Sequence, residues 1–320
     1  MPTVSVIVPS HNYGRFLSQS VGSALAQTYV DLEVIIVDDG STDDTPAVTE
    51  RLASDCRVRA VRLPHRSGPS AARNAGLASA RAPYVAMLDA DDWWALDKLA
   101  PQLKLLQENS DLGLVHSLAT LVSVDGTLIY PAPWQASRFS RAFLSAPVTG
   151  TALPALLLNN TVATSSVLVR HSLLDAVGGY DETLAVCEDW DLWLRLAGRT
   201  RFGWIGEWSV HVRRHGANTH LDVDGMVRAS LRVVADFPHK VVPWDDVGPK
   251  FQAQATANIY RRAAAAWYDT GAVDKAAAHL TRAMLLDTRH IDTWDLRLAA
   301  KCLLDTTSAL RFRRRPQRNS

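Results

Sequence analysis

Short apolar segments alternate with amphipathic segments over the first hundred residues. Four apolar segments have the length and β-branched content of buried strands; they cover Val4–Val8, Leu32–Val37, Val58–Leu63 and Tyr84–Leu88. Between them, the spacing of apolar and small residues predicts helices over 14–27 and 70–80. Pro46 suits the first turn of a further helix, with Ser41 or Thr42 as its expected cap. Strands separated by helices predict βαβ units, and therefore a parallel sheet in an α/β fold.

The pattern becomes more varied after residue 95. A stripe of leucines predicts an amphipathic helix over 96–107; its members are Leu96, Leu99, Leu103 and Leu106. Residues 113–130 predict strands around the turn Asp125-Gly126. Residues 131–150 are rich in Pro, Ala and Ser and predict a loop with a short helix, and 155–212 predict mixed structure.

The last hundred residues have a helical pattern from about residue 226, with a Pro- and Gly-rich boundary at 241–249. Residues 257–290 resemble one tetratricopeptide unit, through Tyr260, Ala264, Trp267, Gly271, Ala276, Leu280 and Ala283. Thr288 replaces the usual proline, and about three units are normally needed for such repeats to stand alone. An ordinary helical hairpin packed on the main domain is the alternative interpretation.

The composition indicates a folded globular chain. Of its 320 residues, 47% are hydrophobic and 21% are charged, which argues against disorder. The formal net charge is only +1, whereas a nucleic-acid-binding protein usually has a clear basic excess, so we expect no nucleic-acid partner. The last ten residues hold five arginines, which leaves the first 310 at −4. We expect an α/β domain over 1–225, a helical region over 226–310 and a basic tail over 311–320.

Nothing in the sequence predicts export or a membrane span. The N-terminus lacks the features of a signal peptide, and no apolar run approaches about 18 residues. Cys56, Cys187 and Cys302 are odd in number and widely spaced, which suits a reducing compartment without disulfides or zinc. We therefore expect a cytoplasmic protein. For the basic tail, peripheral contact with the inner face of a membrane and a frayed, solvated end are the two interpretations.

Carboxylates gather directly after two of the predicted strands. Asp38 and Asp39 follow one strand; Asp89, Asp91 and Asp92 follow another. Ligands bind at the carboxyl ends of strands in an open parallel sheet, so both groups should face one crevice. Mg²⁺ or Mn²⁺ would relieve their mutual repulsion and bridge to substrate phosphates. The alternative is that they are ordinary turn residues. Dinucleotide, P-loop, zincin and α/β-hydrolase signatures are missing, which disfavours those classes.

Five sequence segments occur in a specific order; they are VSVIVPSHN, VIIVDDGSTDDT, GPSAARNAGL, YVAMLDADDWW and CEDWDLWLRLA. Together with GGYDE and VHVRRHGANTH, they resemble glycosyltransferase family 2, the inverting transferases of GT-A fold that use nucleotide sugars. The resemblance covers about residues 3–220 and leaves out the C-terminal hundred residues. It implies a GT-A type, Rossmann-like, mostly parallel sheet flanked by helices, followed here by an all-helical region.

The resemblance implies a donor site along the strand ends. Pro9 and His11 would hold the base, with His11 in place of a frequent tyrosine. Asp39 would hydrogen-bond the base or the ribose. Arg73 would face the nucleotide or its diphosphate, because a guanidinium presents a fixed fork of donors to phosphate.

The resemblance also implies a metal site for Mn²⁺ or Mg²⁺. Asp89 and Asp91 match the DxD pair, in which Asp89 would touch the ribose and Asp91 the metal. Asp92 fits either role. His215 matches a position that contacts the diphosphate or the metal.

The remaining acidic pair is Glu188-Asp189, and the resemblance makes Asp189 the general base. An acceptor hydroxyl is a poor nucleophile, and a positioned carboxylate takes its proton as the bond to the sugar forms. Glu188 would raise the proton affinity of Asp189 if both face the pocket. The alternative is an amphipathic helix with an acidic first turn, and both can hold.

The sequence therefore predicts a metal-dependent inverting glycosyltransferase that moves a sugar from a nucleoside diphosphate donor, expected to be a UDP-sugar, to an acceptor hydroxyl. Two alternatives are a sugar-nucleotide nucleotidyltransferase, whose Gly-rich phosphate loop is missing, and a non-catalytic nucleotide-sugar-binding protein with a helical partner-binding region. The acceptor is left open among a glycan, a lipid-linked sugar, a peptide or protein and a small molecule. A homodimer is also left open.

Overall fold

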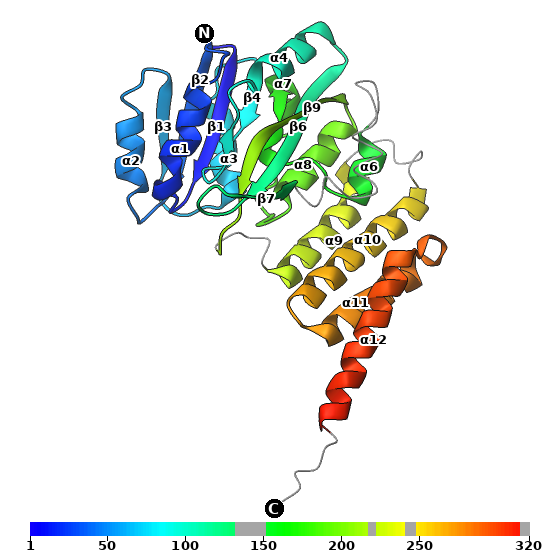
Figure 1. Cartoon of the computed structure of the whole chain (residues 1–320). Helices are drawn as coiled ribbons and strands as arrows, with labels where there is room; N and C mark the ends of the chain where they lie inside the picture. Colours follow the sequence, from blue (N-terminus) through cyan, green and yellow to red (C-terminus); the bar gives the residue numbers. More distant parts are fainter. Residues whose placement is uncertain (132–151, 217–221, 241–247, 314–320) are drawn as a thin grey trace, which may run out of the picture.

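The computed structural model describes residues 1–131, 152–216, 222–240 and 248–313 (Figure 1). Its first elements alternate strand and helix as predicted; they are β1 (Val4–Ser10), α1 (Gly14–Leu25), β2 (Leu32–Asp39), α2 (Thr45–Leu52), β3 (Val58–Leu63), α3 (Pro69–Ser79) and β4 (Tyr84–Met87). These four strands pair in parallel in the order β3-β2-β1-β4. Every residue of β2 is buried, as expected for a strand with helices on both faces.

The sheet continues beyond β4 with a mixed second half, in the order β4-β8-β6-β9-β5, and β7 pairs with β6. The added elements are β5 (Trp93–Trp94), α4 (Leu99–Glu108), β6 (Leu112–Val122), β7 (Leu128–Pro131), β8 (Leu168–Arg170) and β9 (Arg201–Arg213). β9 runs parallel to β6, whereas β8 is antiparallel to β4 and β6. The α/β fold class and the hairpin at Asp125-Gly126 are confirmed. The loop predicted over 131–150 falls, apart from its first residue, outside the described residues.

Two local predictions differ from the structure. α4 begins at Leu99, and Leu96 is 60% exposed because it lies before the helix. α2 has no side-chain cap from Ser41 or Thr42. Instead, the Ser41 hydroxyl accepts a hydrogen bond from the Asn12 N–H at 2.9 Å, and the Thr42 N–H donates to the Asn12 side-chain oxygen at 2.8 Å. These partners lie on the distant loop after β1, so the local pattern gave no sign of them.

Helices make up most of the remaining described chain. They are α6 (Leu153–Leu158), the 3₁₀ turn η2 (Thr164–Ser166), α7 (His171–Ala176), α8 (Glu188–Ala197), α9 (Val223–Lys240), α10 (Gly248–Asp269), α11 (Val273–Leu286), the 3₁₀ turn η5 (Thr288–His290) and α12 (Thr293–Arg313). Val233, Phe237 and Ile259 of α9 and α10 share one apolar cluster with Trp190 and Trp193 of α8. The core thus continues across the predicted division at residue 225, and that division remains a prediction.

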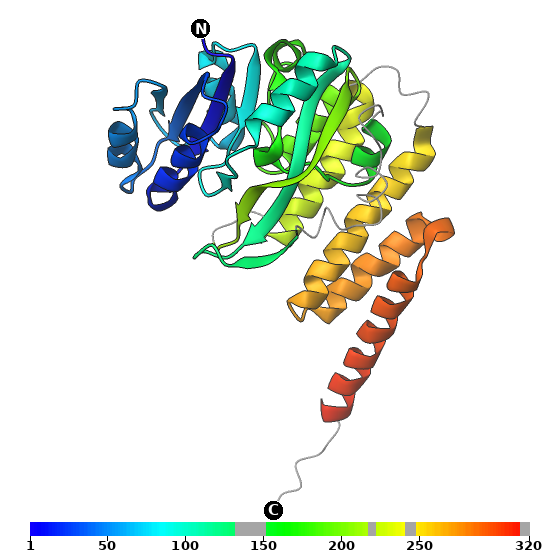
Figure 2. The same cartoon turned by 45° about the horizontal axis from the view of Figure 1, so that its top comes forward.

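α10 and α11 form a helical hairpin beside the sheet domain (Figures 1 and 2). The chain turns at Gly271, whose φ of +80° lies in the region that favours glycine. Ala264, Leu280 and Leu298 meet in a small core between α10, α11 and α12. This is the hairpin that both sequence interpretations required, and α12 extends away from it (Figure 2). The side chains of the predicted basic tail lie outside the described residues.

None of the described helices combines the length and the apolar character that crossing a bilayer requires.

Lys98 is almost wholly buried in the core beside α4, with only 1% of its surface exposed. Its ammonium donates to the Gln102 side-chain oxygen at 2.9 Å and lies 4.1 Å from the centroid of the Trp94 ring. Within the described ranges no carboxylate pairs with it. Burial therefore lowers the pKa of Lys98 well below its ordinary value of 10.5.

We expect the free energy of unfolding of the wild type to rise with pH relative to that of Lys98→Met below about pH 10, by at most about 1.4 kcal/mol per pH unit. The unfolded chain keeps the Lys98 proton to higher pH than the folded chain, so unfolding takes up a proton and becomes less favourable as pH rises. Urea unfolding at several pH values measures the difference. Lys104→Met, at an exposed position of the same helix, should show no such slope. A flat difference for Lys98→Met would contradict the expectation.

Candidate active site

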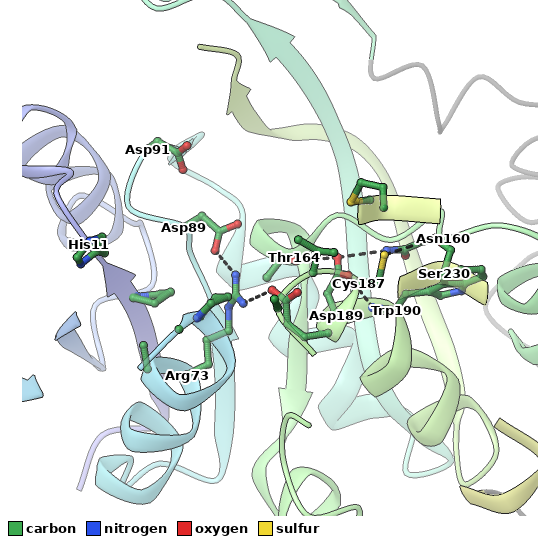
Figure 3. A pocket seen from close by; sticks show the side chains of 18 of the residues that line it. His11, Arg73, Asp89, Asp91, Asn160, Thr164, Cys187, Asp189, Trp190 and Ser230 are labelled. Atoms are coloured by element: carbon green, nitrogen blue, oxygen red, sulfur yellow. Dashed lines mark hydrogen bonds and ion pairs between the residues drawn. The ribbon is translucent and has the colours of Figure 1, made fainter. Parts of the chain in front are cut away.

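Two cavities meet at the carboxyl ends of the parallel strands. The first has a volume of about 540 Å³ and begins at Pro9 and His11 (Figure 3). The second has about 940 Å³ and continues between β9 and α10. Asp89, Asp91 and Asp189 line both. Cavities of this size suit small-molecule ligands, and their junction carries the acidic side chains singled out by the sequence.

The ends of β1 and β2 build the first cavity's inner wall. The His11 ring nitrogen Nδ1 lies 2.7 Å from the main-chain oxygen of Asp39. The two carboxylate oxygens of Asp39 accept the N–H groups of Ser67 and Gly68 at 2.6 and 2.9 Å. Asp39 therefore shapes the loop before α3 while it also lines the cavity. Its expected contact with a base or ribose remains a prediction.

Arg73 lies between carboxylates from two walls of the cavity (Figure 3). One end of its guanidinium donates to Asp89 at 2.7 Å and the other to Glu188 at 2.6 Å. Only 6% of the side chain is exposed, and the guanidinium lies 5.3 Å from the centroid of the Tyr180 ring. Arg73 thus neutralises two acids, which the sequence did not predict. The contact with a diphosphate that the sequence did predict remains a prediction.

Asp91 lines the first cavity and contacts His215. The Asp91 carboxylate lies 2.9 Å from His215 Nε2. The His215 ring stacks on Phe16 at 5.4 Å between centroids and meets the edge of Tyr13 at 5.5 Å, which fixes its orientation. Burial, together with the charges of Asp91 and Asp89, raises the pKa of Tyr13 to about 12. The local potential is therefore negative, as a cation site requires.

A divalent cation fits this donor set only with help from a substrate. Among the described residues, no group of three or more His, Cys, Asp or Glu side chains could hold a metal. Asp91 and His215 supply one oxygen and one nitrogen side by side. Mg²⁺ in particular usually keeps one or two carboxylates and completes its shell with water and substrate phosphates. The pair therefore fits a metal that binds together with a diphosphate.

Asp92 turns away from the first cavity and lines the second. Its carboxylate accepts the Ser165 hydroxyl at 2.6 Å and the Arg213 N–H at 3.0 Å. Burial and then the nearby charges of Asp91 and Asp89 raise the pKa of Asp92 well above its usual range. These contacts hold β9 against the loop that carries Asp89 and Asp91, so the Asp92 side chain supports the structure of the site. The sequence had predicted instead that Asp92 touches the ribose or the metal.

Asp189 faces Asp89 and Asp91 across the cavity, in the first turn of α8 (Figure 3). Cys187, just before the helix, has the left-handed φ of 62°, a conformation that costs free energy in a residue other than glycine. One Asp189 oxygen accepts Asn160 Nδ2 at 3.2 Å and the Thr164 hydroxyl at 3.1 Å; the other accepts the Trp190 N–H at 2.6 Å. Asp189 is thus held by neutral donors.

Burial raises the pKa of Asp189 above its ordinary value, and the charge of Arg73 and these hydrogen bonds only partly oppose it. Glu188 lines the cavity beside Asp189, as the sequence analysis considered, but its nearest charged partner is Arg73. Its own pKa is raised by burial and by the charge of Asp189, against the effect of Arg73. The main cause of the raised Asp189 pKa is therefore burial.

The structure brings most of the predicted site residues together; Pro9, His11, Asp39, Arg73, Asp89, Asp91 and Asp189 line the first cavity. His215 reaches the site through Asp91. Asn160 and Thr164 were missed. The only sequence signal for them was that the apolar run before Asn159-Asn160 ends in two amides and a polar segment.

Known proteins resemble this chain in sequence and in fold. Residues 5–134 match the family model described as glycosyl transferase family 2. An uncharacterized glycosyltransferase of Nostoc sp. is 30% identical over 231 residues, which are 68% of this chain and 66% of the relative. A mannosyltransferase of Pyrobaculum calidifontis, solved in complex with GDP-Man and Mn²⁺, has a TM-score of 0.65 at 21% identity, covering 97% of this chain and 80% of that chain.

A further solved structure, S. aureus TarS in complex with UDP, has a TM-score of 0.61 at 16% identity and covers 95% of this chain and 88% of that chain. At these identities, the two solved structures show the GT-A type fold alone. The chain spans between 22% and 66% of the length of eight curated relatives with which it was aligned. The matched family model and these relatives show that the chain carries a glycosyltransferase family 2 domain, matched over residues 5–134.

Proposed function

We propose that the chain is a metal-dependent inverting glycosyltransferase that moves a sugar from a nucleoside diphosphate sugar to an acceptor hydroxyl. One observation carries the proposal: Asp91 with His215 and the buried Asp189 lie on opposite walls of one cavity junction. A donor that bridges the junction would have its diphosphate at the first wall and its sugar before Asp189. The three cysteines are free thiols, which supports a cytoplasmic location as part of the proposal.

The first cavity is the proposed donor site. Pro9, His11 and Asp39 at the strand ends would hold the base and ribose, where ligands bind in open parallel sheets. The structural relatives include complexes with UDP and with GDP-Man and Mn²⁺, which supports a nucleotide-sugar donor and a divalent metal. We propose a UDP-sugar as the donor of this chain.

Asp189 is the proposed general base. A carboxylate with a raised pKa is a stronger base than an ordinary one, yet it stays ionised near neutral pH if donors hold it. Asn160 and Thr164 are such donors, and they also orient one carboxylate oxygen. The acceptor hydroxyl would lose its proton to this oxygen as it attacks the sugar carbon opposite the leaving group, and that direction of attack inverts the anomeric centre.

Arg73 and the acidic wall would prepare the leaving group's site. Arg73 holds Asp89 and Glu188 in place and balances their charges. Asp91 and His215 are the residues that would hold a divalent cation. When bound, such a cation neutralises the charge that develops on the departing nucleoside diphosphate.

A nucleotide-release assay with UDP- and GDP-sugars, with and without Mn²⁺, tests the proposal, and NMR of the product's anomeric proton tests inversion. Metal-dependent release of UDP and a product of opposite anomeric configuration would support it. Release of pyrophosphate from a sugar phosphate and a nucleoside triphosphate would support the nucleotidyltransferase alternative. Tight nucleotide-sugar binding without turnover on any acceptor would support the binding-protein alternative.

Thr164→Val should move the acid limb of the kcat/KM profile to higher pH by roughly one unit. The Thr164 hydroxyl donates to Asp189 and favours its charged form, so its removal raises the pKa of Asp189 further, and the base is then protonated at higher pH. At the alkaline end the rate should change little. Thr161→Val is the matched control, because the buried Thr161 hydroxyl has no hydrogen-bond partner among the described residues. An unshifted limb in Thr164→Val would count against Asp189 as the base.

A further inference from the structure

The second cavity carries the active site away from the proposed donor position. Asp89, Asp91 and Asp189 line it at its junction with the first cavity, and α10 together with the segment after α11 contributes much of the remaining lining. The α10 residues that line it share one long face; they are Gln254, Asn258, Arg261, Arg262, Ala265, Ala266 and Asp269. The Gln254 amide can hydrogen-bond sugar hydroxyls, whereas that of Asn258 is bound to Leu158 and Arg261, and the alanines leave room for a ring. This wall is therefore built to hold a polar molecule beside Asp189.

Four arginines line the second cavity, but two of them are engaged in holding the fold. Arg261 forms ion pairs with Asp295 at 3.0 Å and Asp287 at 3.3 Å. Arg213 donates to the main-chain oxygens of Asp91 and Val124 and lies over aromatic rings. Their positive charges and donors are thus largely satisfied by the protein.

Arg262 differs from both. Its side chain is exposed within the cavities and it lines both of them. It donates one hydrogen bond to the neutral side-chain oxygen of Asn159, and its guanidinium lies 5.5 Å from the centroid of the Trp190 ring. No carboxylate of the described chain pairs with it. A guanidinium has five N–H donors, and one hydrogen bond to the described residues leaves others for a ligand in the cavities that Arg262 lines.

Arg262 and Asp189 both form hydrogen bonds with the segment Asn159-Asn160. Asn159 accepts from Arg262, and the next residue, Asn160, donates to the Asp189 carboxylate. Neighbouring Cα atoms are about 3.8 Å apart, so a group bound by Arg262 lies close to the proposed base. The Trp190 ring and the Asn159 amide fix the guanidinium before any ligand arrives, which reduces the entropy lost on binding.

We infer that the acceptor is an anionic sugar or glycan, whose carboxylate or phosphate is bound by Arg262 while one of its hydroxyls faces Asp189. The inference rests on the proposed function and names its acceptor class. A guanidinium fork matches two oxygens of a carboxylate or phosphate with parallel charged hydrogen bonds. Arg214, which lies directly after β9, lines the same cavity, is exposed and has no acidic partner in the part of the chain described, so it adds positive charge. Asp269, about two turns along α10, confines an anion to the Arg262 side.

Ligand-observed NMR titration of the full chain, saturated with UDP and Mg²⁺, tests the inference. Three probes share one sugar ring: methyl glucuronide carries a carboxylate, methyl glucoside 6-phosphate a phosphate, and methyl glucoside no charge. We expect at least one anionic probe to bind about tenfold more tightly than the neutral probe. Arg262→Gln should abolish this preference and Arg262→Lys should keep part of it. Whichever anionic probe is preferred identifies the source of the negative charge.

Arg228→Gln is the matched control, because Arg228 is an exposed arginine of the neighbouring α9 that lines neither cavity. It should bind the probes like the wild type. Equal binding of the three probes to the wild type, or an anionic preference that survives in Arg262→Gln, would overturn the inference. So would a tenfold loss of UDP affinity in Arg262→Gln with unchanged binding of the anionic probes, since Arg262 would then serve the donor.

The same samples separate this inference from the proposed function. Titration with UDP, with and without Mg²⁺, reads the donor site alone. Absence of metal-dependent UDP binding in the wild type would count against the proposed function, and the probes, titrated on the chain without UDP, would still show whether Arg262 selects an anion.

Discussion

Asp189→Asn should lower kcat for sugar transfer by about 10²–10⁴-fold, the range typical for loss of a positioned general base. Asparagine keeps the size of the side chain and an oxygen that can accept from Thr164 and Asn160, but it takes no proton. UDP affinity should stay close to that of the wild type, because Asp189 belongs to the wall opposite Asp91 and His215. Steady-state kinetics together with a UDP titration measures both effects.

Asp175→Asn serves as the control for this variant, because Asp175 is an exposed carboxylate of α7 outside both cavities. It should turn over like the wild type. Near-normal turnover in a folded Asp189→Asn protein would remove Asp189 from the mechanism and leave the inverting reaction without its proposed base.

Local sequence pattern was enough to predict the first half of the sheet. Each of its strands is bounded by its own turn, and the first three are each followed directly by a helix, so hydrophobic spacing within about ten residues carries the information. The second half was harder, because its strands depend on distant partners. The two residues of β5 become a strand only by pairing with His211 and Val210 of β9. Such pairing follows from tertiary packing, and the pattern of neighbouring residues does not predict it.

The candidate site shows the same division between local and distant information. Asp89, Asp91 and Asp189 were singled out from motifs that each lie on one strand end or helix start. Their partners come from elsewhere in the chain: Arg73 reaches Asp89 from α3, and Thr164 reaches Asp189 from a 3₁₀ turn. The sequence therefore predicts the charged groups but not the contacts that shift their pKa values.

Asp92 illustrates why neighbours in a motif can differ in role. It adjoins Asp91, yet its carboxylate is taken up by Ser165 and by the main chain of Arg213. The resulting burial makes its charged form unfavourable, whereas Asp91 remains at the cavity surface beside His215. A run of three acids near one strand thus leaves one group at the cavity surface, pairs one with Arg73 and uses one to support the fold.

Asp91→Ala should reduce transfer by about 10³-fold or more, since a bound cation supplies several kcal/mol of charge stabilisation at the leaving group. The variant removes the carboxylate whose oxygen lies 2.9 Å from His215 Nε2. The gain in UDP affinity on adding Mn²⁺ should disappear as well. Folding should be retained, because the charge of Asp91 disfavours the ionised form of its buried neighbour Asp92, and its removal relieves that repulsion.

Calorimetric titration of UDP with and without Mn²⁺, beside thermal unfolding of the metal-free protein, tests these three expectations together. Asp97→Ala is the control, because Asp97 is exposed, lies six residues further along and lines neither cavity. It should keep both turnover and the Mn²⁺ effect. If Asp91→Ala keeps a metal-dependent UDP affinity, the cation is held elsewhere. If Asp91→Ala keeps sugar transfer as well, the departing diphosphate needs no cation beside Asp91. The placement of Asp91 and Asp189 on opposite walls of the cavity junction is then not the basis of catalysis.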